Sequence, residues 1–155
     1  MKINVQKLTE NAVMPKFAYD TDAGADLTAT SIEFKDDLVI YGTGLAFEIP
    51  KGYFMQLYPR SSVMKYDLEL TNCVGVVDAD YRGEVKFTYR CIHDTTQLSK
   101  NYHNPLVKLD FPKIYDVGDR IGQAIIRKLV PTEYEEVDTL EDSVRGIGGW
   151  GSTGI

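Results

Sequence analysis

Apolar and polar positions alternate along much of the chain, in short runs bounded by turn residues. The clearest runs cover residues 37–59, 70–92 and 119–131. Val, Ile, Tyr, Phe and Thr dominate these runs, as they do in β-strands. Turns containing Gly or Pro interrupt them at residues 41–44, 50–52 and 80–83. Because many short strands follow one another at close intervals, the pattern predicts an all-β sandwich or barrel.

Two stretches depart from this alternation. Residues 61–66 predict one short helix, with Ser61 or Ser62 able to cap its N-terminus. Residues 93–113 are polar and weakly patterned, which indicates a long loop. Loops of that length inside a compact domain are usually functional or mobile.

The size and composition fit a single globular domain followed by a tail. The chain has 155 residues, of which 26% are charged and 43% hydrophobic. We expect one domain over residues 1–144, with an insertion at about 93–113, and a glycine-rich arm at 145–155.

Charge and cysteine content narrow the classes of function. A net charge of −6 argues against a protein that coats nucleic acid. No apolar segment typical of a signal peptide follows Lys2, and no run is long enough to span a membrane, so a cytoplasmic location is expected. Cys73 and Cys91 lie in strand-like sequence and are predicted to be buried free thiols.

The arm RGIGGWGSTGI (145–155) has two interpretations. It is either a frayed terminus or a segment that orders over an anionic ligand. In the second case Arg145 and the glycine N–H groups contact the anion, Ser152 adds a hydroxyl, and Trp150 stacks on a ring.

The stretch VVDADYRGE (76–84) combines carboxylates with a turn. A calcium loop beginning at Asp78 is excluded, because Arg82 and Tyr89 stand where that loop needs an oxygen ligand and a glutamate. A plain hairpin with residues 78–83 as its turn is one interpretation. A fixed carboxylate that serves as general base toward water is the other.

Two further stretches have a plain structural interpretation, and the first of them also has a functional one. YPRSS (58–62) places Arg60 and two serines at a helix start, where an anion is favoured, but Arg60 could also form a surface ion pair. GDRIGQ (118–123) could be a turn with Asp119 and Arg120 paired. No zinc site is expected, because the two histidines lack cysteines at the required spacing.

Five stretches together resemble, in order, the five motifs of the trimeric dUTPase family. They are DAGADL, PRSS, NCVGVVDADYRGE, GDRIGQ and RGIGGWGSTG, and they span Ala23 to Gly154. The resemblance implies a jelly-roll-like β barrel that forms a homotrimer, with the C-terminal arm of one subunit closing over the active site of another. It also implies hydrolysis of dUTP to dUMP and pyrophosphate, with Mg²⁺ bound to the triphosphate.

The resemblance assigns roles to individual residues. Asp78 corresponds to the base that activates water, and Tyr81 to the ring beneath the deoxyribose. Asn72, Val76 and Val77 correspond to the residues that bind the uracil edge, and Lys86 to a position near the nucleotide. Asp26 is similar to the acid that approaches Mg²⁺ through water. The residues expected to hold the triphosphate or close over the nucleotide are Arg60, Ser61, Ser62, Gln123, Arg145, Gly149, Trp150, Gly151 and Ser152.

Three departures from the family pattern bear on these expectations. Trp150 stands where the family usually has Phe, and it should stack on the base at least as well. The segment after Arg60 is slightly shorter than usual, with Asp67 near a usual glycine. The link from Glu84 to Gly118 is longer, and this insertion resembles phage-encoded members from Gram-positive hosts, some of which also bind a repressor protein.

Two alternatives remain beside a dUTP diphosphatase. A dCTP deaminase-like enzyme would share the fold but need a catalytic Glu. A dUTP-sensing regulatory protein would bind a repressor partner through residues 93–113. The insertion could equally be a surface loop without a partner.

Overall fold

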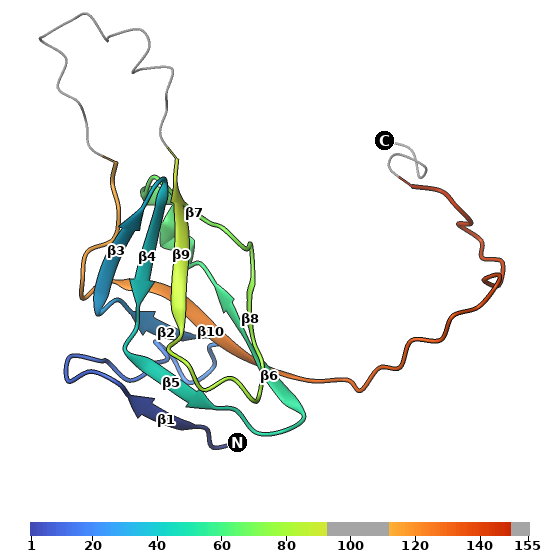
Figure 1. The fold of residues 1–155 in the computed structure, drawn as a ribbon, viewed down its shortest axis with the longest axis horizontal. Coiled ribbons are helices and arrows are strands. Elements are labelled where there is room, and N and C mark those ends of the chain that lie inside the picture. The colour runs from blue at the N-terminus through green and yellow to red at the C-terminus, as the bar shows by residue number, and fades with distance from the viewer. Residues whose placement is uncertain (93–111, 150–155) are drawn as a thin grey trace, which may run out of the picture.

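The protein is built from short antiparallel strands in two four-stranded sheets and one two-stranded sheet, as predicted (Figure 1). The computed structural model describes residues 1–92 and 112–149. Its strands are β1 (Asn4–Lys7), β2 (Ala25–Thr28), β3 (Ser31–Lys35), β4 (Leu38–Gly42), β5 (Leu45–Glu48), β6 (Tyr53–Tyr58), β7 (Leu68–Leu70), β8 (Gly75–Val77), β9 (Lys86–Cys91) and β10 (Arg120–Lys128). One 3-10 helix, η1 (Ser61–Lys65), joins β6 to β7.

The strand order explains the jelly-roll-like arrangement. One sheet has the order β2-β10-β6-β8 and the other β3-β4-β9-β7, while β1 pairs with β5. The strands therefore form separate stacked sheets rather than one closed barrel, and the all-β jelly-roll-like fold is confirmed. Strand β8 lies at an edge of its sheet, where only β6 pairs with it among the described residues.

The core fills the space between the two large sheets. Leu27, Tyr41, Tyr89 and Ile121 are completely buried, and they come from strands of both sheets. In β2 and β6 the buried positions alternate with more exposed ones, as expected for strands with one face on a core. Two tyrosine hydroxyls inside this core have carbonyl partners: Tyr89 Oη donates to the Ile121 carbonyl at 2.6 Å, and Tyr41 Oη to the Tyr115 carbonyl at 3.2 Å. The core fixes the strands that carry the site described below.

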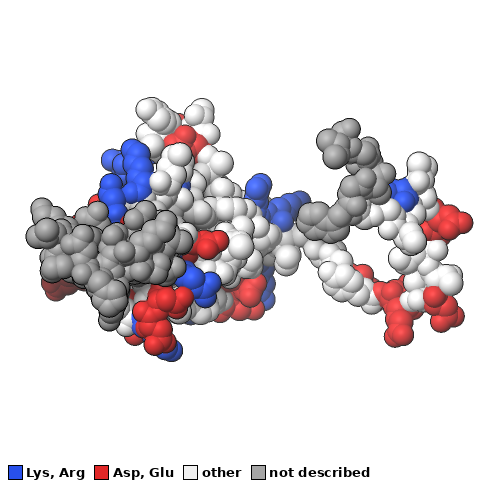
Figure 2. Space-filling view, turned by 90° about the horizontal axis from the view of Figure 1, so that it is seen from above, with Lys and Arg blue, Asp and Glu red and all other residues white. Residues whose placement is uncertain are grey.

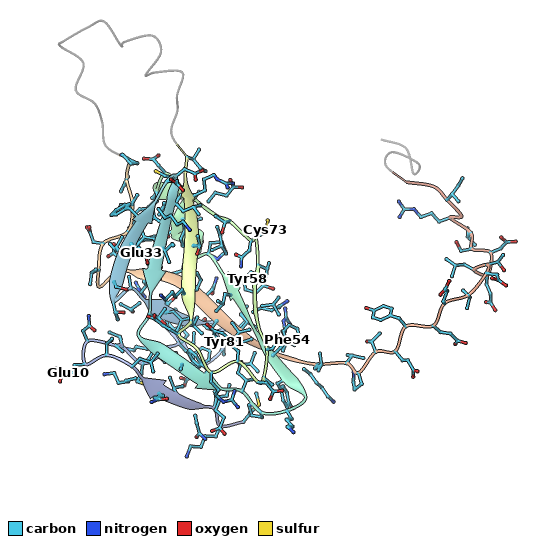
Figure 3. All side chains as sticks on the ribbon, viewed as in Figure 1. Glu10, Glu33, Phe54, Tyr58, Cys73 and Tyr81 are labelled. Atoms are coloured by element: carbon cyan, nitrogen blue, oxygen red, sulfur yellow. The ribbon has the colours of Figure 1, made fainter. Side chains whose placement is uncertain are left out.

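Three local predictions are corrected by the structure. Residues 78–83 do not close a hairpin, because the preceding β8 and the following β9 belong to different sheets. The short helix exists but is a 3-10 helix whose N-cap residue is Arg60, and neither Ser61 nor Ser62 caps it through its side chain. Both cysteines are free, as predicted, yet Cys73 is exposed on the loop before β8 and Cys91 is only half-buried (Figure 3).

The chain leaves the sheets after β10 as an extended arm (Figure 1). Residues 129–147 are all exposed. Figure 2 shows acidic side chains along this part of the chain, where Glu133, Glu135, Glu136, Asp138, Glu141 and Asp142 lie. Within residues 1–92 and 112–149, no helix has the length and apolar character needed to cross a membrane.

Candidate active site

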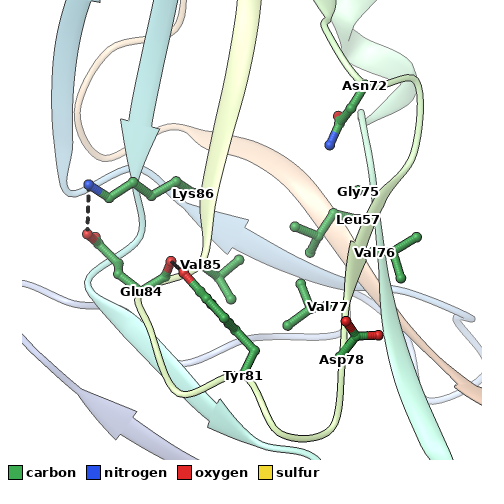
Figure 4. A pocket seen from close by; sticks show the side chains of 10 residues that line it. All are labelled: Leu57, Asn72, Gly75, Val76, Val77, Asp78, Tyr81, Glu84, Val85 and Lys86. Carbon is green, nitrogen blue, oxygen red and sulfur yellow. Dashed lines mark hydrogen bonds and ion pairs between the residues drawn. The ribbon is translucent and has the colours of Figure 1, made fainter.

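A cavity of about 600 Å³ opens beside the edge strand β8 (Figure 4). The residues that line it are Leu57, Asn72, Gly75, Val76, Val77, Asp78, Tyr81, Glu84, Val85 and Lys86. Six of these ten were predicted from the sequence to lie at the nucleotide or to activate water: Asn72, Val76, Val77, Asp78, Tyr81 and Lys86. The structure thus brings these six predicted residues together within one chain, while Trp150, which was expected to stack on the base, lies outside the described residues.

The edge position of β8 leaves polar backbone groups available to a ligand. Only β6 pairs with β8 in the described residues, so the outer side of the β8 backbone keeps N–H and C=O groups without a strand partner. The Asn72 side chain lies at the N-terminal end of this strand and Asp78 at its C-terminal end (Figure 4). A planar group with alternating donors and acceptors could therefore lie along this edge.

Tyr81 is held against the floor of the cavity by its own turn. Its hydroxyl donates to the Glu84 carbonyl at 3.0 Å. A Cβ atom at position 83 would come within 2.4 Å of the Tyr81 hydroxyl, so only glycine leaves room for the ring there. The ring is 48% exposed and presents a flat face to a ligand.

Glu84 ties this turn to the rest of the fold. Its Oε1 accepts a hydrogen bond from the Gly44 N–H at 2.8 Å. Its Oε2 lies 3.4 Å from Lys86 Nζ. The contact places the Lys86 ammonium at the cavity wall (Figure 4).

The Asp78 carboxylate lies where two cavities meet. Besides the first cavity, Asp78 and Val76 line a second one of about 540 Å³, together with residues from β6 and the start of the arm. The side chain is exposed, and it makes no hydrogen bond or ion pair with the residues that the structure describes. It is therefore free to accept a proton from a water molecule.

A second cluster gathers the residues expected to hold phosphates. Asp26 on β2 accepts hydrogen bonds from Arg60 Nε at 2.8 Å and from Arg120 Nη1 at 3.0 Å. The predicted pairing of Asp119 with Arg120 is wrong, because Asp119 instead accepts from the Asp116 N–H at 2.9 Å. Asp26 thus holds two guanidinium groups side by side, with its own side chain only 14% exposed.

Gln123 and the serines complete this second cluster. Gln123 Nε2 donates to the Pro59 carbonyl at 3.2 Å. A Cβ atom on Gly24 would lie 2.7 Å from Gln123 Oε1, so the glycine makes room for that amide. Arg60 Nη1 donates to Ser62 Oγ at 3.3 Å, while Ser61 is exposed at the start of η1. Within the described residues, no hydrogen bond joins this cluster to the cavity lined by β8.

The chain matches one known protein family over much of its length. A family model described as dUTPase matches residues 10–96, more than half of the chain. A curated relative from Nautilia profundicola is 38% identical over 99% of both chains. A relative from Solanum lycopersicum is 37% identical over 97% of this chain and 80% of its own. Both are named deoxyuridine 5'-triphosphate nucleotidohydrolase. The chain belongs to the dUTPase family.

Solved structures of phage dUTPases share the fold. The dUTPase of Staphylococcus bacteriophage 80alpha, solved as a G164S mutant with dUpNHpp, superposes with a TM-score of 0.77 at 25% identity over 99% of both chains. The dUTPase of phage phi11 of S. aureus, which carries a species-specific insert, gives a TM-score of 0.70 at 25% identity over 92% of this chain and all of its own.

The described part of the arm lies away from both groups of residues. Arg145 Nε donates to the Gly148 carbonyl at 2.8 Å, and its Nη2 lies 3.4 Å from the Gly149 carbonyl. In this single chain the two predicted arm residues therefore contact each other rather than the cavity. Trp150, Gly151 and Ser152 lie outside the described residues, as does most of the insertion at 93–113.

The carboxylates of this dUTPase-family site do not form a cage for a resident metal ion. Within residues 1–92 and 112–149, no three His, Cys, Asp or Glu side chains gather closely enough to hold a metal. Both oxygens of Asp26 already accept hydrogen bonds from arginine. Such a donor set fits Mg²⁺ that arrives bound to a nucleotide and keeps its waters, and the water-mediated role of Asp26 stays a prediction.

Sequence reasoning missed three residues of this dUTPase-family site. Arg120 and Glu84 were quoted within motifs but given no role at the site. Gly24 gained importance only from its neighbour in space, Gln123. The charge of Arg120 beside a glycine-rich motif could have identified it.

Proposed function

We propose that the protein hydrolyses dUTP to dUMP and pyrophosphate. The observation that carries this proposal is the single cavity that unites Asn72, the edge of β8, Asp78 and Tyr81 in a member of the dUTPase family. The names of the curated relatives support the same reaction. A dCTP deaminase-like activity has no comparable support.

The base is selected by the edge of β8. The Asn72 side chain and the unpaired backbone groups around Val76 and Val77 offer donors and acceptors to one edge of uracil. A base with a different hydrogen-bonding edge would leave these groups unpaired, which is costly in a site that excludes water. Tyr81 lies beneath the sugar, where its ring leaves no room for a 2′-hydroxyl. The cavity therefore favours deoxyuridine over cytidine and ribonucleotides.

Asp78 activates the water that attacks the α-phosphorus. Its carboxylate takes a proton from water as the new P–O bond forms. The bond between the α-phosphorus and the oxygen that bridges to the β-phosphate breaks, and pyrophosphate leaves. The carboxylate has no other partner among the described residues, so no ion pair has to break before it accepts the proton.

The triphosphate is held by the cluster around Arg60. Arg60, Ser61, Ser62 and Gln123 supply donors for phosphate oxygens, and Asp26 keeps Arg60 in place at 2.8 Å. Mg²⁺ bound to the triphosphate would neutralise part of the charge that develops on the phosphate oxygens. Arg145, Gly149, Trp150, Gly151 and Ser152 would then close over the nucleotide.

The full site requires more than one subunit. The cavity beside β8, the Arg60 cluster and the arm are three separate groups of residues within this chain, and the arm extends away from the sheets (Figure 1). A homotrimer in which each subunit contributes one group to every site unites them.

A panel of nucleotides tests the proposed reaction. With Mg²⁺ present, dUTP should give dUMP and pyrophosphate, whereas dCTP, dTTP and UTP should react at least about 100-fold more slowly. Release of ammonia from dCTP would instead identify a deaminase. Equal rates with dUTP and UTP would contradict the placement of Tyr81 beneath the sugar.

A second role, binding of a repressor-type protein partner at residues 93–113, stays a prediction. The 80alpha phage dUTPase, which belongs to a group said to control transfer of virulence genes, supports a regulatory role. The phi11 dUTPase likewise carries a species-specific insert. Both ends of the insertion meet at Asp67, which accepts the Ile92 N–H at 2.8 Å and the Lys113 N–H at 2.7 Å. A short glycine linker could therefore replace residues 93–111 without disturbing either end. This variant should lose partner binding but keep dUTP hydrolysis, and loss of both in an intact oligomer would contradict a separate partner-binding segment.

A further inference from the structure

Tyr115 is fixed in the aromatic part of the core. Its backbone N–H donates to the Tyr41 hydroxyl at 3.1 Å, and that hydroxyl donates to the Tyr115 carbonyl at 3.2 Å. The Tyr115 ring packs on Tyr66, with 3.9 Å between ring centroids and 34° between ring planes. The residue is 1% exposed. Backbone and ring together determine where the hydroxyl lies.

The Tyr115 hydroxyl is a buried polar group without a good partner. Among the residues that the structure describes, it is the only buried side-chain nitrogen or oxygen atom with no hydrogen bond. Such groups are rare and call for an explanation. Burial raises the pKa of Tyr115, while the Ser62 side chain and the charge of Arg60 act in the opposite direction. The Tyr115 ring also packs on Tyr66, the C-cap residue of the helix η1 that carries Ser62. The Tyr115 side chain therefore lies against the segment expected to hold the triphosphate.

The hydrogen bonds of Ser62 show what this hydroxyl could do. Ser62 Oγ already accepts a hydrogen bond from Arg60 Nη1 at 3.3 Å. A serine hydroxyl has one proton and two lone pairs. If Tyr115 donates to the second lone pair, both lone pairs are filled and the serine proton can only be donated outward. A phosphate oxygen bound beside Arg60 would be an acceptor for that proton.

We propose that Tyr115 is a positioning residue for triphosphate binding. Its hydroxyl donates to Ser62 Oγ when the nucleotide binds, and so directs the Ser62 proton to a phosphate oxygen. Ser62 is the partner that moves, because the Tyr115 backbone is held by Tyr41 and its ring by Tyr66. This inference rests on the proposed function, since it takes the ligand at Ser62 to be a nucleoside triphosphate.

The test compares two ligands in four variants of the full chain. The ligands are the non-hydrolysable α,β-imido analogue of dUTP with Mg²⁺, and deoxyuridine, which carries no phosphate. The variants are Tyr115→Phe, Ser62→Ala, their double mutant, and Tyr89→Phe as control. Tyr89 belongs to the same aromatic cluster, and its hydroxyl donates to Ile121 rather than to the phosphate residues. Phenylalanine keeps the tyrosine ring, and alanine removes only the serine hydroxyl, so the fold should be retained in all four variants.

Tyr115→Phe should raise the Kd of the dUTP analogue about 3- to 10-fold and leave that of deoxyuridine unchanged. Ser62→Ala should do the same, and the double mutant should lose no more than Ser62→Ala alone, because the two hydroxyls act as one unit. Tyr89→Phe should lower the melting temperature without changing the ratio of the two affinities.

Two results would overturn the proposal. An unchanged affinity ratio in Tyr115→Phe, or losses that add fully in the double mutant, would show that Tyr115 does not act through Ser62. A different result, in which the wild-type protein binds the analogue no more tightly than deoxyuridine, would contradict triphosphate binding itself and the present proposal with it.

Discussion

Asp26 holds together two arginines of the proposed phosphate site. Its two oxygens accept from Arg60 and Arg120, and its side chain is only 14% exposed. The pair fixes both guanidinium groups before a ligand arrives, which reduces the entropy lost on binding. It also leaves the remaining N–H donors of each arginine available for phosphate oxygens.

Asp26→Asn should therefore reduce both stability and affinity. Asparagine leaves two arginines without a countercharge in a partly buried place, so we expect the free energy of unfolding to fall by about 1–3 kcal/mol. Binding of the α,β-imido dUTP analogue should weaken as well. Urea unfolding and titration with the analogue measure the two effects.

Asp37→Asn is the matched control for that change. Asp37 contacts Arg90 at the same 2.8 Å, but both side chains are more than half exposed. Exposed ion pairs of this kind contribute about 0–1 kcal/mol. If Asp37→Asn destabilised the protein as much as Asp26→Asn, burial would not be the reason for the effect at Asp26.

At the level of residues, the ordered motifs predicted the cavity well but not the partners of individual charges. Asn72 and Asp78 are close in sequence, so local strand geometry places them at the two ends of β8. Arg120 and Asp26 are far apart in sequence, and only the pairing of β10 with β2 brings them together. A neighbour in sequence, Asp119, was therefore the wrong partner to predict.

The arm is the element that we expect to matter for activity but not for the stability of the fold. Residues 129–147 are all exposed, so they bury little apolar surface within this chain. Ending the chain after Val144 should lower kcat/KM for dUTP at least about 100-fold, because the nucleotide would no longer be enclosed. The melting temperature should change by less than about 2 °C. Unchanged turnover, or a large loss of stability, would contradict this account of the arm.

The strands show which elements can be predicted from the alternation of apolar and polar residues. Runs with strong β-formers gave β4–β6 and β8–β10, because one face of each packs on the core. Strands β1 and β3 were not identified, since most of their residues are exposed and their runs are short. The hairpin expected around Asp78 was wrong because sheet membership depends on distant partners, which no local pattern encodes.

The molecule as a whole buries three tyrosines in one cluster, and this gives a pH dependence. Burial raises the pKa of Tyr41, Tyr89 and Tyr115 above the ordinary value of 10.0. Below pH 10 both folded and unfolded states keep these protons, so stability is independent of these groups. Above pH 10 the unfolded state loses the protons first, and unfolding becomes more favourable.

Stability should thus fall above pH 10, by up to about 1.4 kcal/mol per pH unit for each tyrosine. Urea unfolding between pH 8 and 11.5 measures this slope. Tyr89→Phe should make the slope shallower, while phenylalanine at the exposed Tyr134 should leave it unchanged. An identical slope in Tyr89→Phe would show that the buried cluster is not the cause.

Sharing of sites between subunits can be tested by mixing two inactive variants. One variant carries Asp78→Asn, and the other lacks residues 145–155. In mixed trimers about a quarter of the sites would combine an intact Asp78 from one chain with an intact arm from another. Co-expression should therefore restore about a quarter of wild-type activity. No recovery in a purified mixed oligomer would mean that each site is formed within one chain.

The most direct measurement for the central claim is the effect of Asp78→Asn on turnover and binding in the same preparation. Asparagine is nearly the same shape as aspartate but cannot take a proton from water. We predict that kcat for dUTP falls about 100- to 10,000-fold, while the Kd of the α,β-imido dUTP analogue changes by less than about threefold. Asp37→Asn, which removes a carboxylate that lines neither cavity, should change neither value. Turnover of dUTP by Asp78→Asn at a rate close to that of the wild-type protein would contradict the account.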